Sequence, residues 1–549
     1  MIKPAREALH KHSGLWKPLL LLVAITLLVY AVSFFNGFVW DDEVIIVNNP
    51  QTLSLRNITE VLLSPDMVKP YYRPLNRATY MFDYQLAGMN PAWYHGVNIV
   101  IHLGNVVLLY LVCRHFLPDR NATLLVALLF AVHPANAESV NFISARNTLL
   151  ALFFSLASLL AFVNARKKKL RWPLLSALLF FCALLSKETG FMLIAVITLY
   201  CIISLPGEEN EQWQWRKRLS AMIPYLFVTI VYFFMRIYSL QEIMGISTPA
   251  EENLISRLAK NYHIIPQYLG LLLFPSDLTI FHSVPRGGLF TPLWHFAAWL
   301  ALLAAIFLIV TSRNRAALFG LAWFTINYVP IANIVPIPSG QITERFLYFP
   351  AAGFFIALGV VLSWFRSRQG NKYLFWGGTT AVLLACATMT IQRNLDWRND
   401  LKLFSSSARN DPMSPEAHYN LGTAYREHGN MAAARKEWET TLAIDPSHAE
   451  ALIQMGTLAA TQGELQKAEQ YYLASLKASP GKTDSYKSMA HYNLGKIYEK
   501  WGQPLQALPH YEQFLKVAPL TYLEYKPDAE QRIARLRRAL PDIPDNSRP

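Results

Sequence analysis

Residues 16–43 read WKPLLLLVAITLLVYAVSFFNGFVWDDE, a long apolar run that ends on three acidic residues. A helix needs about 20 mostly apolar residues to cross a bilayer, and residues 15–35 supply them. Lys3, Arg6, Lys11 and Lys17 lie before or at the start of the run, but it is too long for a signal peptide and lacks a small-residue cleavage site. The stretch therefore predicts an uncleaved first membrane span with a cytoplasmic N-terminus.

Ten further apolar stretches predict ten more spans. They lie near residues 95–113, 121–133, 147–164, 172–186, 189–205, 219–238, 291–311, 316–331, 346–364 and 373–391. Hydrophobic residues make up 53% of the 549 residues and charged residues only 16%, which is typical of a membrane protein with a soluble appendage. We assign residues 259–274 to the interface or to a re-entrant loop, because letting them span would invert every later loop.

Basic residues gather in alternate loops between these spans. The basic loops contain Arg114, Arg120, residues 166–171 and 216–218, Arg313, Arg315, Arg366, Arg368 and Lys372. The short loops between them carry only Arg146, Lys187 and Arg345. By the positive-inside rule the basic loops face the cytoplasm, and eleven spans place the C-terminal part outside it. The formal charge of +13 thus reflects topology and predicts no nucleic-acid partner.

A 34-residue period begins after Asp411. The pairs at this spacing are Gly422 and Gly456, Gly429 and Gly463, Ala434 and Ala468, and Pro446 and Pro480. A third unit runs from Ala490 to Pro519, after an insertion at residues 481–485. This is the period of tetratricopeptide repeats, and three such units can stack into a continuous core. The array is expected either to bind peptides in its concave face or to act only as a structural or dimerising support.

The sequence therefore predicts an all-α protein in three parts. A membrane domain of about eleven spans occupies residues 1–395, with a first outer loop at 36–94. A tetratricopeptide domain occupies 396–525, and residues 526–549 form a C-terminal tail.

The first outer loop opens on adjacent carboxylates, Asp41 and Asp42. Two acids at a membrane surface repel one another and lose hydration, so one should protonate easily or need a cation, as suits a general base. Later in the loop Arg73 and Arg77 are one helical turn apart and could face one anion. A helix cap with solvated arginines explains the same residues about equally well.

Three short outer loops also carry ionic side chains. The second contains His133, Glu138 and Arg146, where a His and a carboxylate suit a metal or a phosphate, although two ligands are weak evidence. The third contains Lys187 and Glu188, and the last contains Glu344, Arg345 and Tyr348. Charges at this depth are expected to be paired or to face a cavity.

One predicted span also carries polar residues on one face. These are His95, Asn98, His102 and Asn105, spaced by three and four, and interhelical hydrogen bonding is the preferred explanation. The ionic groups of the outer loops, by contrast, recur on one side of the membrane. We expect them to converge on an outward-facing cavity in which cations hold an anionic lipid head and a carboxylate transfers a proton.

A set of short motifs in a fixed order resembles a known family. The motifs are WDDEVIIVNNP, YYRPLNRATY, FAVHPANAESV, LLSKETG, FPSDLTIF and TERFLYFPAAG, followed by the repeats. An acidic first outer loop after span one resembles the GT-C glycosyltransferases. The whole order is similar to the transmembrane and tetratricopeptide-repeat-containing O-mannosyltransferases, over nearly the entire chain. The chain departs from the animal members in its fewer repeats and short inner loops, which suggests a bacterial inner-membrane relative.

The resemblance implies transfer of a sugar from a polyprenyl-phosphate donor, with inversion, to an extracytoplasmic hydroxyl such as a protein Ser or Thr. Asp41 or Asp42, with Asp42 slightly favoured, would be the base. Arg345, with Lys187, Arg73 and His133, would hold the donor phosphate. His133 and Glu138 could orient the donor or bind a divalent metal such as Mg or Mn. Supporting residues would be Glu344, Glu188, Tyr348 and His102.

The repeats would bind the acceptor protein. Two alternatives stay open: a noncatalytic membrane-anchored scaffold for envelope assembly, and a GT-C enzyme that modifies a lipid or a glycan.

Overall fold

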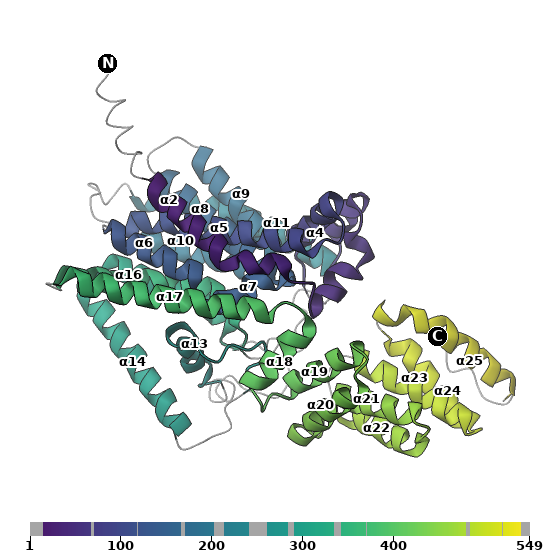
Figure 1. The fold of residues 1–549 in the computed structure, drawn as a ribbon. Coiled ribbons are helices and arrows are strands. Elements are labelled where there is room, and N and C mark those ends of the chain that lie inside the picture. The colour runs from purple at the N-terminus through teal and green to yellow at the C-terminus, as the bar shows by residue number, and fades with distance from the viewer. Residues whose placement is uncertain are drawn as a thin grey trace. The chain divides into compact units, whose positions relative to one another are not determined.

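The computed structural model describes residues 15–66, 71–117, 119–165, 171–202, 214–240, 261–283, 290–333, 342–368, 371–478, 484–518 and 520–539. The chain divides into two compact units, residues 1–403 and 404–549, which we call the membrane unit and the repeat unit. Figure 1 shows that both units are built from helices. Among the described residues there is no strand, which confirms the all-α prediction.

The membrane unit begins with α2 (Trp16–Tyr30) and the turn η1 (Ala31–Phe35), followed by a loop with short helices. Its remaining longer helices are α4 (Pro74–Ala87), α5 (Pro91–Phe116), α6 (Arg120–Val132), α8 (Arg146–Ala165), α9 (Arg171–Ser186), α10 (Met192–Ile202), α11 (Gln214–Leu240), α13 (Ile264–Leu273), α14 (Phe290–Ser312), α15 (Arg315–Tyr328), α16 (Tyr348–Arg368) and α17 (Lys372–Asp396). A large apolar core joins residues of α2, α5, α6, α8, α15 and α16.

Seven helices in the described part are long and apolar enough to cross a membrane, or eight if α6 and the short helix after it form one bent span. The chain is therefore an integral membrane protein. These eight correspond to eight of the eleven predicted spans. The other three predictions fall on α9, α10 and α15, which have 16, 11 and 14 described residues. Parts of 189–205 and of the basic loops at 166–171 and 216–218 lie outside the described residues or side chains.

Helix α13 occupies the segment that we assigned to the interface or to a re-entrant loop. It has ten residues, so its rise is about 15 Å, roughly half the thickness of the hydrocarbon core. The helix is too short to cross a bilayer by itself.

Polar residues on α5 join neighbouring elements. Asn98 Nδ2 donates to the carbonyl of Val140 at 3.1 Å, and Asn105 Nδ2 donates to that of Leu149 at 3.0 Å. His102 Nδ1 accepts from the Tyr348 hydroxyl at 2.7 Å, and the same hydroxyl accepts from Asn105 at 3.0 Å. The preferred explanation of this stripe, interhelical hydrogen bonding, is confirmed. His102 and Tyr348 thus join α5 to α16.

The repeat unit is a series of helix pairs. Following α18 (Asp400–Asn410), the pairs are α19 (Pro415–Glu427) with α20 (Met431–Ile444), α21 (Ala449–Thr461) with α22 (Leu465–Ala478), and α23 (Asp484–Lys500) with α24 (Pro504–Val517). Gly429, Gly463 and Gly502 have φ values of 77°, 83° and 68° at the turns inside the pairs, where a left-handed backbone favours glycine.

Glycines at the predicted period also allow the paired helices to approach closely. A Cβ atom on Gly456 would lie 2.7 Å from the Tyr472 ring, and one on Gly495 would lie 2.8 Å from the Tyr511 ring. Pro480, Pro519 and most of the insertion at 481–485 lie outside the described residues.

The predicted C-terminal tail is partly a helix. Residues Lys526–Ala539 form α25, and its buried Ala529, Ile533 and Leu536 join the core of the last repeat. The sequence spacing of these apolar residues, four and three, places them on one helix face, which explains why the segment packs instead of remaining an extended tail. Residues 540–549 lie outside the described part.

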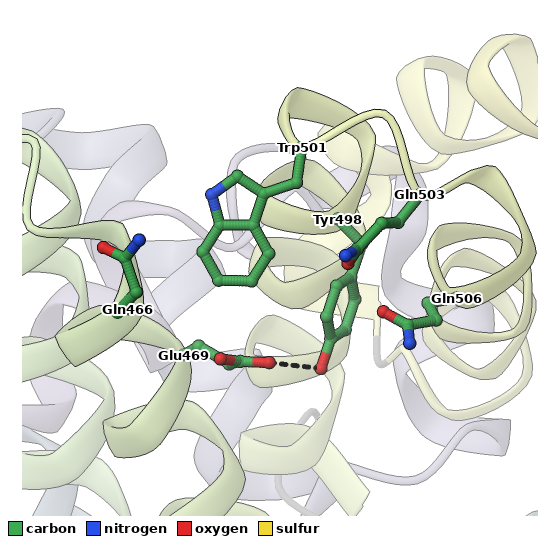
Figure 2. Close-up of a pocket in the computed structure, with 6 residues that line it drawn as sticks. All are labelled: Gln466, Glu469, Tyr498, Trp501, Gln503 and Gln506. Carbon is green, nitrogen blue, oxygen red and sulfur yellow. Dashed lines mark hydrogen bonds between the residues drawn. The ribbon is translucent and has the colours of Figure 1, made fainter.

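The repeat unit also contains an open pocket of about 600 Å³. Its lining is Gln466, Glu469, Tyr498, Trp501, Gln503 and Gln506. Figure 2 shows the indole and phenol rings beside the amide side chains, with the Tyr498 hydroxyl donating to Glu469 at 2.7 Å. The pocket is polar, and it offers a peptide both hydrogen-bonding groups and an aromatic surface.

Candidate active site

The connection between α6 and α8 organises the site. This α6–α8 loop (residues 133–146) contains η5 (Pro134–Asn136), α7 (Ala137–Asn141) and η6 (Ile143–Ala145), and nearly all of it is buried. Phe142 and Ser144 contact the segment with Asp41 and Asp42, Glu138 contacts Arg345, and Arg146 contacts α4 and α5. The loop therefore connects most of the ionic groups that the sequence singled out.

The two predicted bases have different surroundings. Asp42 is fully buried; its Oδ1 accepts from the main-chain N–H and the hydroxyl of Ser144 at 2.8 and 2.6 Å, and its Oδ2 accepts from Val39 N–H at 3.3 Å. Burial raises the pKa of Asp42 to about 7, against these hydrogen bonds, which lower it.

Asp41 is partly exposed, and no described residue hydrogen-bonds to its carboxylate. Burial raises its pKa, and the charge of Arg345 lowers it. A carboxylate with both oxygens available suits proton transfer, whereas one that already accepts three hydrogen bonds suits anchoring. The structure thus favours Asp41, in place of our slight preference for Asp42.

Trp40, the residue directly before these two acids, has an unusual backbone conformation. Its φ of 56° lies in the left-handed region, which costs a non-glycine residue about 1–3 kcal/mol. The indole stacks on Phe142 at 5.1 Å between ring centroids, and it meets Phe281 edge-on at 5.3 Å. The guanidinium of Arg345 lies 5.5 Å from the centre of the same indole. Aromatic packing therefore places Arg345 next to the Trp40–Asp42 segment.

Arg345 is paired with Glu138. The residue lies in η9 (Glu344–Leu347), its main-chain N–H donates to Glu138 Oε2 at 2.8 Å, and its Nη1 contacts Oε1. Within the described part of the chain, its Nε and Nη2 have no hydrogen-bond partner, so two of its donor groups stay available. Glu138, which is fully buried, is occupied by this arginine and does not serve as a metal ligand here.

Lys187 lies close to the same Phe346 ring as Arg345. Its ammonium donates to the Thr148 hydroxyl at 2.7 Å and lies 5.5 Å from the Phe346 ring, while Arg345 is 5.4 Å from that ring. The side chain is buried, and no described carboxylate forms an ion pair with it. Burial, with the charges of Arg73 and Arg345, lowers the pKa of Lys187 to about 7. An anion beside Lys187 would stabilise the charged ammonium.

Arg73 and Arg77 do not face a common anion. Arg73 forms a two-pronged contact with Glu188, with Nη2 to Oε2 at 3.0 Å and Nε to Oε2 at 3.2 Å, and Arg236 Nη1 lies 3.6 Å from the same carboxylate. Arg77 instead donates to the carbonyls of Ser64 and Pro65 at 2.9 and 2.8 Å.

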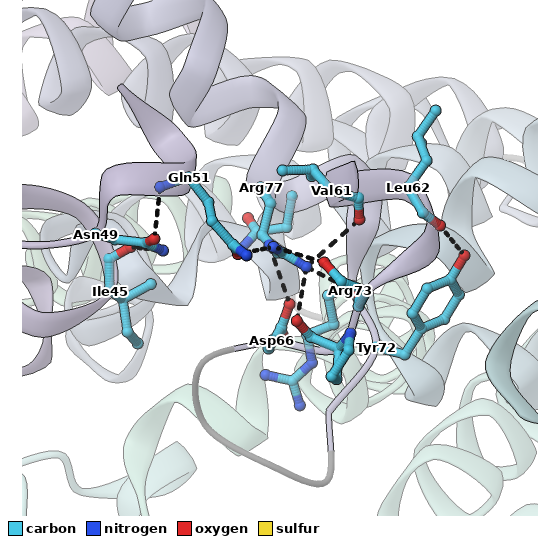
Figure 3. Close-up of polar contacts among 12 residues, drawn as sticks. Ile45, Asn49, Gln51, Val61, Leu62, Asp66, Tyr72, Arg73 and Arg77 are labelled. Carbon is cyan, nitrogen blue, oxygen red and sulfur yellow. Dashed lines mark hydrogen bonds and ion pairs between the residues drawn. The ribbon is translucent and has the colours of Figure 1, made fainter. Parts of the chain in front are cut away.

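The two side chains diverge because Arg73 precedes α4 while Arg77 lies inside it. Arg77 contacts the side chains of Asp66 and Gln51 in the loop before α4, as Figure 3 shows. Its role is therefore structural. The predicted shared anion site at Arg73 and Arg77 is wrong. Glu188, the predicted supporting residue, is the anion that Arg73 binds.

His133 is also committed to the fold. Its Nδ1 accepts from Ala135 N–H at 3.3 Å, so its Nε2 carries the proton and donates to the carbonyl of Leu272 at 3.1 Å. Neither nitrogen is left for a phosphate or a metal, which contradicts both predicted roles. The described residues include no group of three or more His, Cys, Asp or Glu side chains placed to hold a metal ion. The residues present at His133 and Glu138 therefore do not fit the Mg or Mn site that we considered.

Glu344 belongs to a buried network beside Arg345. Its Oε1 lies 3.5 Å from Arg393 Nη2 and 3.7 Å from His282 Nε2, and Arg393 Nη1 lies 3.3 Å from Asp396. Glu344 thus connects η9, which also contains Arg345, to α17.

Two important residues received no site role from the sequence: Arg146, which was noted only as an ionic residue of the second outer loop, and Ser144. Arg146, fully buried, donates to Asn98 Oδ1 at 2.7 Å and to the Tyr94 carbonyl at 3.1 Å, and it pairs with Asp83. Ser144 anchors Asp42. The deep position of Arg146 at the start of an apolar helix was the available signal, because such a charge requires a partner.

Comparison with known proteins agrees with the sequence resemblance. Residues 83–238 match the family model of dolichyl-phosphate-mannose-protein mannosyltransferases, and residues 415–448 and 447–519 match tetratricopeptide repeat models. The predicted repeats are thereby confirmed.

Curated relatives include animal proteins named protein O-mannosyl-transferases. The chain is 25% identical to mouse TMTC3 over 508 residues, which cover 85% of this chain and 55% of the relative. It is 26% identical to F38B6.6 of Caenorhabditis elegans, with 78% of this chain and 63% of the relative covered. The predicted resemblance to O-mannosyltransferases is confirmed, although the chain spans little more than half the length of the TMTC3 relative.

Two solved structures show weaker likeness. The apo oligosaccharyltransferase of Archaeoglobus fulgidus gives a TM-score of 0.42 at 13% identity, covering 74% of this chain and 60% of that chain. ArnT from Cupriavidus metallidurans bound to undecaprenyl phosphate gives 0.39 at 14% identity, covering 90% and 79%.

Proposed function

We propose that the chain is a GT-C-type membrane glycosyltransferase that moves a sugar from a polyprenyl-phosphate donor to an extracytoplasmic hydroxyl, most simply a Ser or Thr of a protein. The observation that carries the proposal is the grouping of an available carboxylate, Asp41, with two buried cations, Arg345 and Lys187. The mannosyltransferase model matched over residues 83–238 includes Glu138 and Lys187, which lie in this group.

The reaction requires charge stabilisation at two points. As the acceptor oxygen attacks the anomeric carbon, its proton passes to Asp41. At the same time the bond from that carbon to the donor phosphate breaks, and the electron pair leaves with the phosphate oxygen. The available N–H groups of Arg345 and the ammonium of Lys187 stabilise the charge that builds there, because they are fixed before the reaction starts.

Glu138 and Ser144 keep these groups in place. Glu138 binds both the main-chain N–H and the guanidinium of Arg345, which fixes that cation relative to the α6–α8 loop. Ser144 fixes Asp42 and hence the neighbouring Asp41. The acid and the cation are thus anchored to one rigid loop, which is the arrangement that catalysis by positioning requires.

Replacing Lys187 with Met should weaken donor binding about tenfold or more, because a phosphate would lose a desolvated ammonium partner. Titration of the purified protein with a polyprenyl phosphate measures this change. Lys467→Met in the exposed surface of the repeats is the matched control and should leave the affinity unchanged. Equal affinity in the Lys187 variant would remove this residue from the phosphate site.

Donor affinity should also fall as the pH rises above about 7. The groups around Lys187 are Arg73, Arg345, Glu188 and Glu138, and burial with the two arginines lowers the pKa of Lys187 to about 7 in the unliganded protein. A bound phosphate favours the ammonium and raises that pKa. Affinity is therefore constant below the unliganded pKa and declines above it. A flat profile between pH 6 and 8 would contradict this linkage.

We propose that the N-terminus is cytoplasmic and the repeat unit periplasmic, in a bacterial inner membrane. The distribution of basic residues in the sequence supports this orientation. A cysteine placed at Ser479 should react with an impermeant maleimide in spheroplasts. Reaction only after lysis would reverse the orientation.

The proposed partner of the repeat unit is the acceptor protein. The polar pocket beside Trp501 supports this role, since amides and an aromatic ring can bind an extended peptide. Mass spectrometry of envelope proteins from cells with and without the chain tests the function. Loss of hexose from specific Ser or Thr residues supports protein glycosylation. A change confined to lipids or glycans indicates a different acceptor, and no change supports a scaffold.

A further inference from the structure

The segment that leaves the last membrane helix contacts the segment that carries the acids. Residues 394–400, which we call the exit segment, comprise the last three residues of α17, the turn after it and the first residue of α18. The main-chain N–H of Gly37 donates to the carbonyl of Arg398 at 3.1 Å. Asn36 Nδ2 donates to the carbonyl of Asn394 at 3.0 Å. The two segments are about 360 positions apart in the sequence, and they are joined by one backbone–backbone and one side-chain–backbone hydrogen bond.

Buried side chains strengthen this junction. Asn394 Nδ2 donates to the carbonyl of Val29 at 2.9 Å, and its Oδ1 accepts from Asn141 at 2.6 Å. Asn141 in turn accepts from Asn36 at 3.0 Å. The fully buried Trp397 stacks on Phe142, with 5.7 Å between ring centroids, and Phe142 stacks on Trp40. The exit segment therefore reaches the α6–α8 loop as well as the residues before Asp41.

Asp400 makes the contact nearest to the acids. Its Oδ1 accepts from the main-chain N–H of Trp40 at 2.8 Å. Trp40 is the residue with a left-handed backbone, and it immediately precedes Asp41. A hydrogen bond to this N–H fixes the orientation of the peptide plane at the strained residue, and that orientation determines where the following side chain points.

We propose that Asp400 is a positioning residue for Asp41: it holds Trp40 in the left-handed conformation and thereby directs the Asp41 carboxylate toward the acceptor hydroxyl. The inference rests on the proposed function for its catalytic consequence and on the contacts above for its geometry. Asp400 is the first residue of α18. The helix that leads into the repeat unit therefore begins with the residue that positions Asp41. Asp400 acts through Trp40 and touches no substrate.

Positioning requires a hydrogen-bond acceptor oxygen of Asp400 in a fixed place and does not require its negative charge. A variant that keeps the oxygen and loses the charge separates these two effects. Asp400→Asn keeps the shape and one carbonyl oxygen able to accept from Trp40 N–H, so it should retain positioning. Asp400→Ala removes the acceptor and should release the Trp40 backbone. Asp119→Ala is the matched control, because Asp119 also accepts at a helix start, from Asn121 N–H at 3.0 Å, and pairs with Arg366, at the opposite end of α6 from the α6–α8 loop.

Amide hydrogen exchange at Trp40 tests the geometry without any assay of transfer. In the full-length protein, Asp400→Ala should accelerate exchange at Trp40 at least tenfold, while Asp400→Asn and Asp119→Ala leave it close to wild type. Unchanged exchange in Asp400→Ala would overturn the proposal, whether or not the chain transfers sugar.

Kinetics test the consequence. Asp400→Ala should lower kcat on the order of tenfold to a hundredfold, with little change in the donor Kd, and Asp400→Asn should restore most of the rate. If Asp400 had a purely structural role, Asp400→Ala would reduce the yield of folded protein as much as Asp119→Ala does. The kcat per folded molecule of Asp400→Ala would then be unchanged. That result, or failure of Asp400→Asn to restore the rate, would contradict positioning. Absence of transfer in wild type would instead reject the proposed function and leave the exchange result to decide the geometry.

Discussion

Asp41→Asn should lower kcat for sugar transfer by about 10²- to 10⁴-fold, the range that a positioned general base contributes. The amide has nearly the same shape but cannot accept the proton of the attacking hydroxyl. Asp41 makes no hydrogen bond to another described residue, so the variant should insert and fold like wild type. The rate of transfer from a polyprenyl-phosphate sugar, per folded molecule, measures the effect, and the donor Kd should change little.

Asp42→Asn provides the contrast at the neighbouring position. Asp42 accepts two hydrogen bonds from Ser144 and one from Val39 N–H, so an amide in this place would present an N–H group to a donor. We expect lower thermal stability together with reduced activity, since the whole Trp40–Asp42 segment loses its anchor. If Asp41→Asn kept full activity while Asp42→Asn lost only activity, the assignment of the base to Asp41 would be wrong.

Arg146→Met should destabilise the membrane unit by about 3–5 kcal/mol, the cost of breaking a buried ion pair by removing one partner. The guanidinium is fully buried and binds Asp83, Asn98 and the Tyr94 carbonyl. Its loss leaves the Asp83 carboxylate without its cation in a poorly solvated place. The midpoint of thermal unfolding in detergent, followed at a constant detergent concentration, measures the change.

Two further variants test this explanation. Arg146→Met combined with Asp83→Leu should recover much of the lost stability, because neither charge then stays buried alone. Arg120→Met replaces an exposed arginine at the start of α6 and should change stability by less than about 0.5 kcal/mol. A double variant as unstable as Arg146→Met alone would show that packing around Arg146, and not the ion pair, supplies its stabilising effect.

The repeats and most of the spans could be predicted because their signals are local and periodic. A 34-residue spacing of glycines reports a helix pair directly, and Gly456 and Gly495 lie against aromatic rings as that spacing requires. Long apolar stretches report spans in the same way. The segments at α9, α10 and α15 have the same local apolar signal as the longer helices, although only 16, 11 and 14 of their residues are described as helix.

The pairing of the ionic groups could not be predicted, because it depends on contacts between distant segments. The sequence suggested that Arg345, Glu138 and Lys187 belong together, and the structure does bring them around the α6–α8 loop and Phe346. The sequence could not show that Glu138 pairs with Arg345, or that both ring nitrogens of His133 hydrogen-bond to main-chain groups.

The choice between the adjacent acids was hidden for a related reason. Asp41 and Asp42 have the same chemistry, and what separates them in the structure is that Ser144 and Val39 hydrogen-bond to Asp42. The exit segment was missed because it contains no long apolar run and no repeat. A mixed polar and aromatic stretch, NLDWRND at residues 394–400, lies at the end of the last long helix and was the available signal.

The most direct test uses the purified full-length chain in liposomes with a panel of polyprenyl-phosphate hexoses and a library of Ser- and Thr-containing peptides. We predict transfer of one hexose to peptide by the wild-type chain, with the donor consumed in equal amount, and little or no transfer by Asp41→Asn. Equal transfer by Asp41→Asn, or none by the wild type with any donor of the panel under conditions where the protein is folded, would contradict the account.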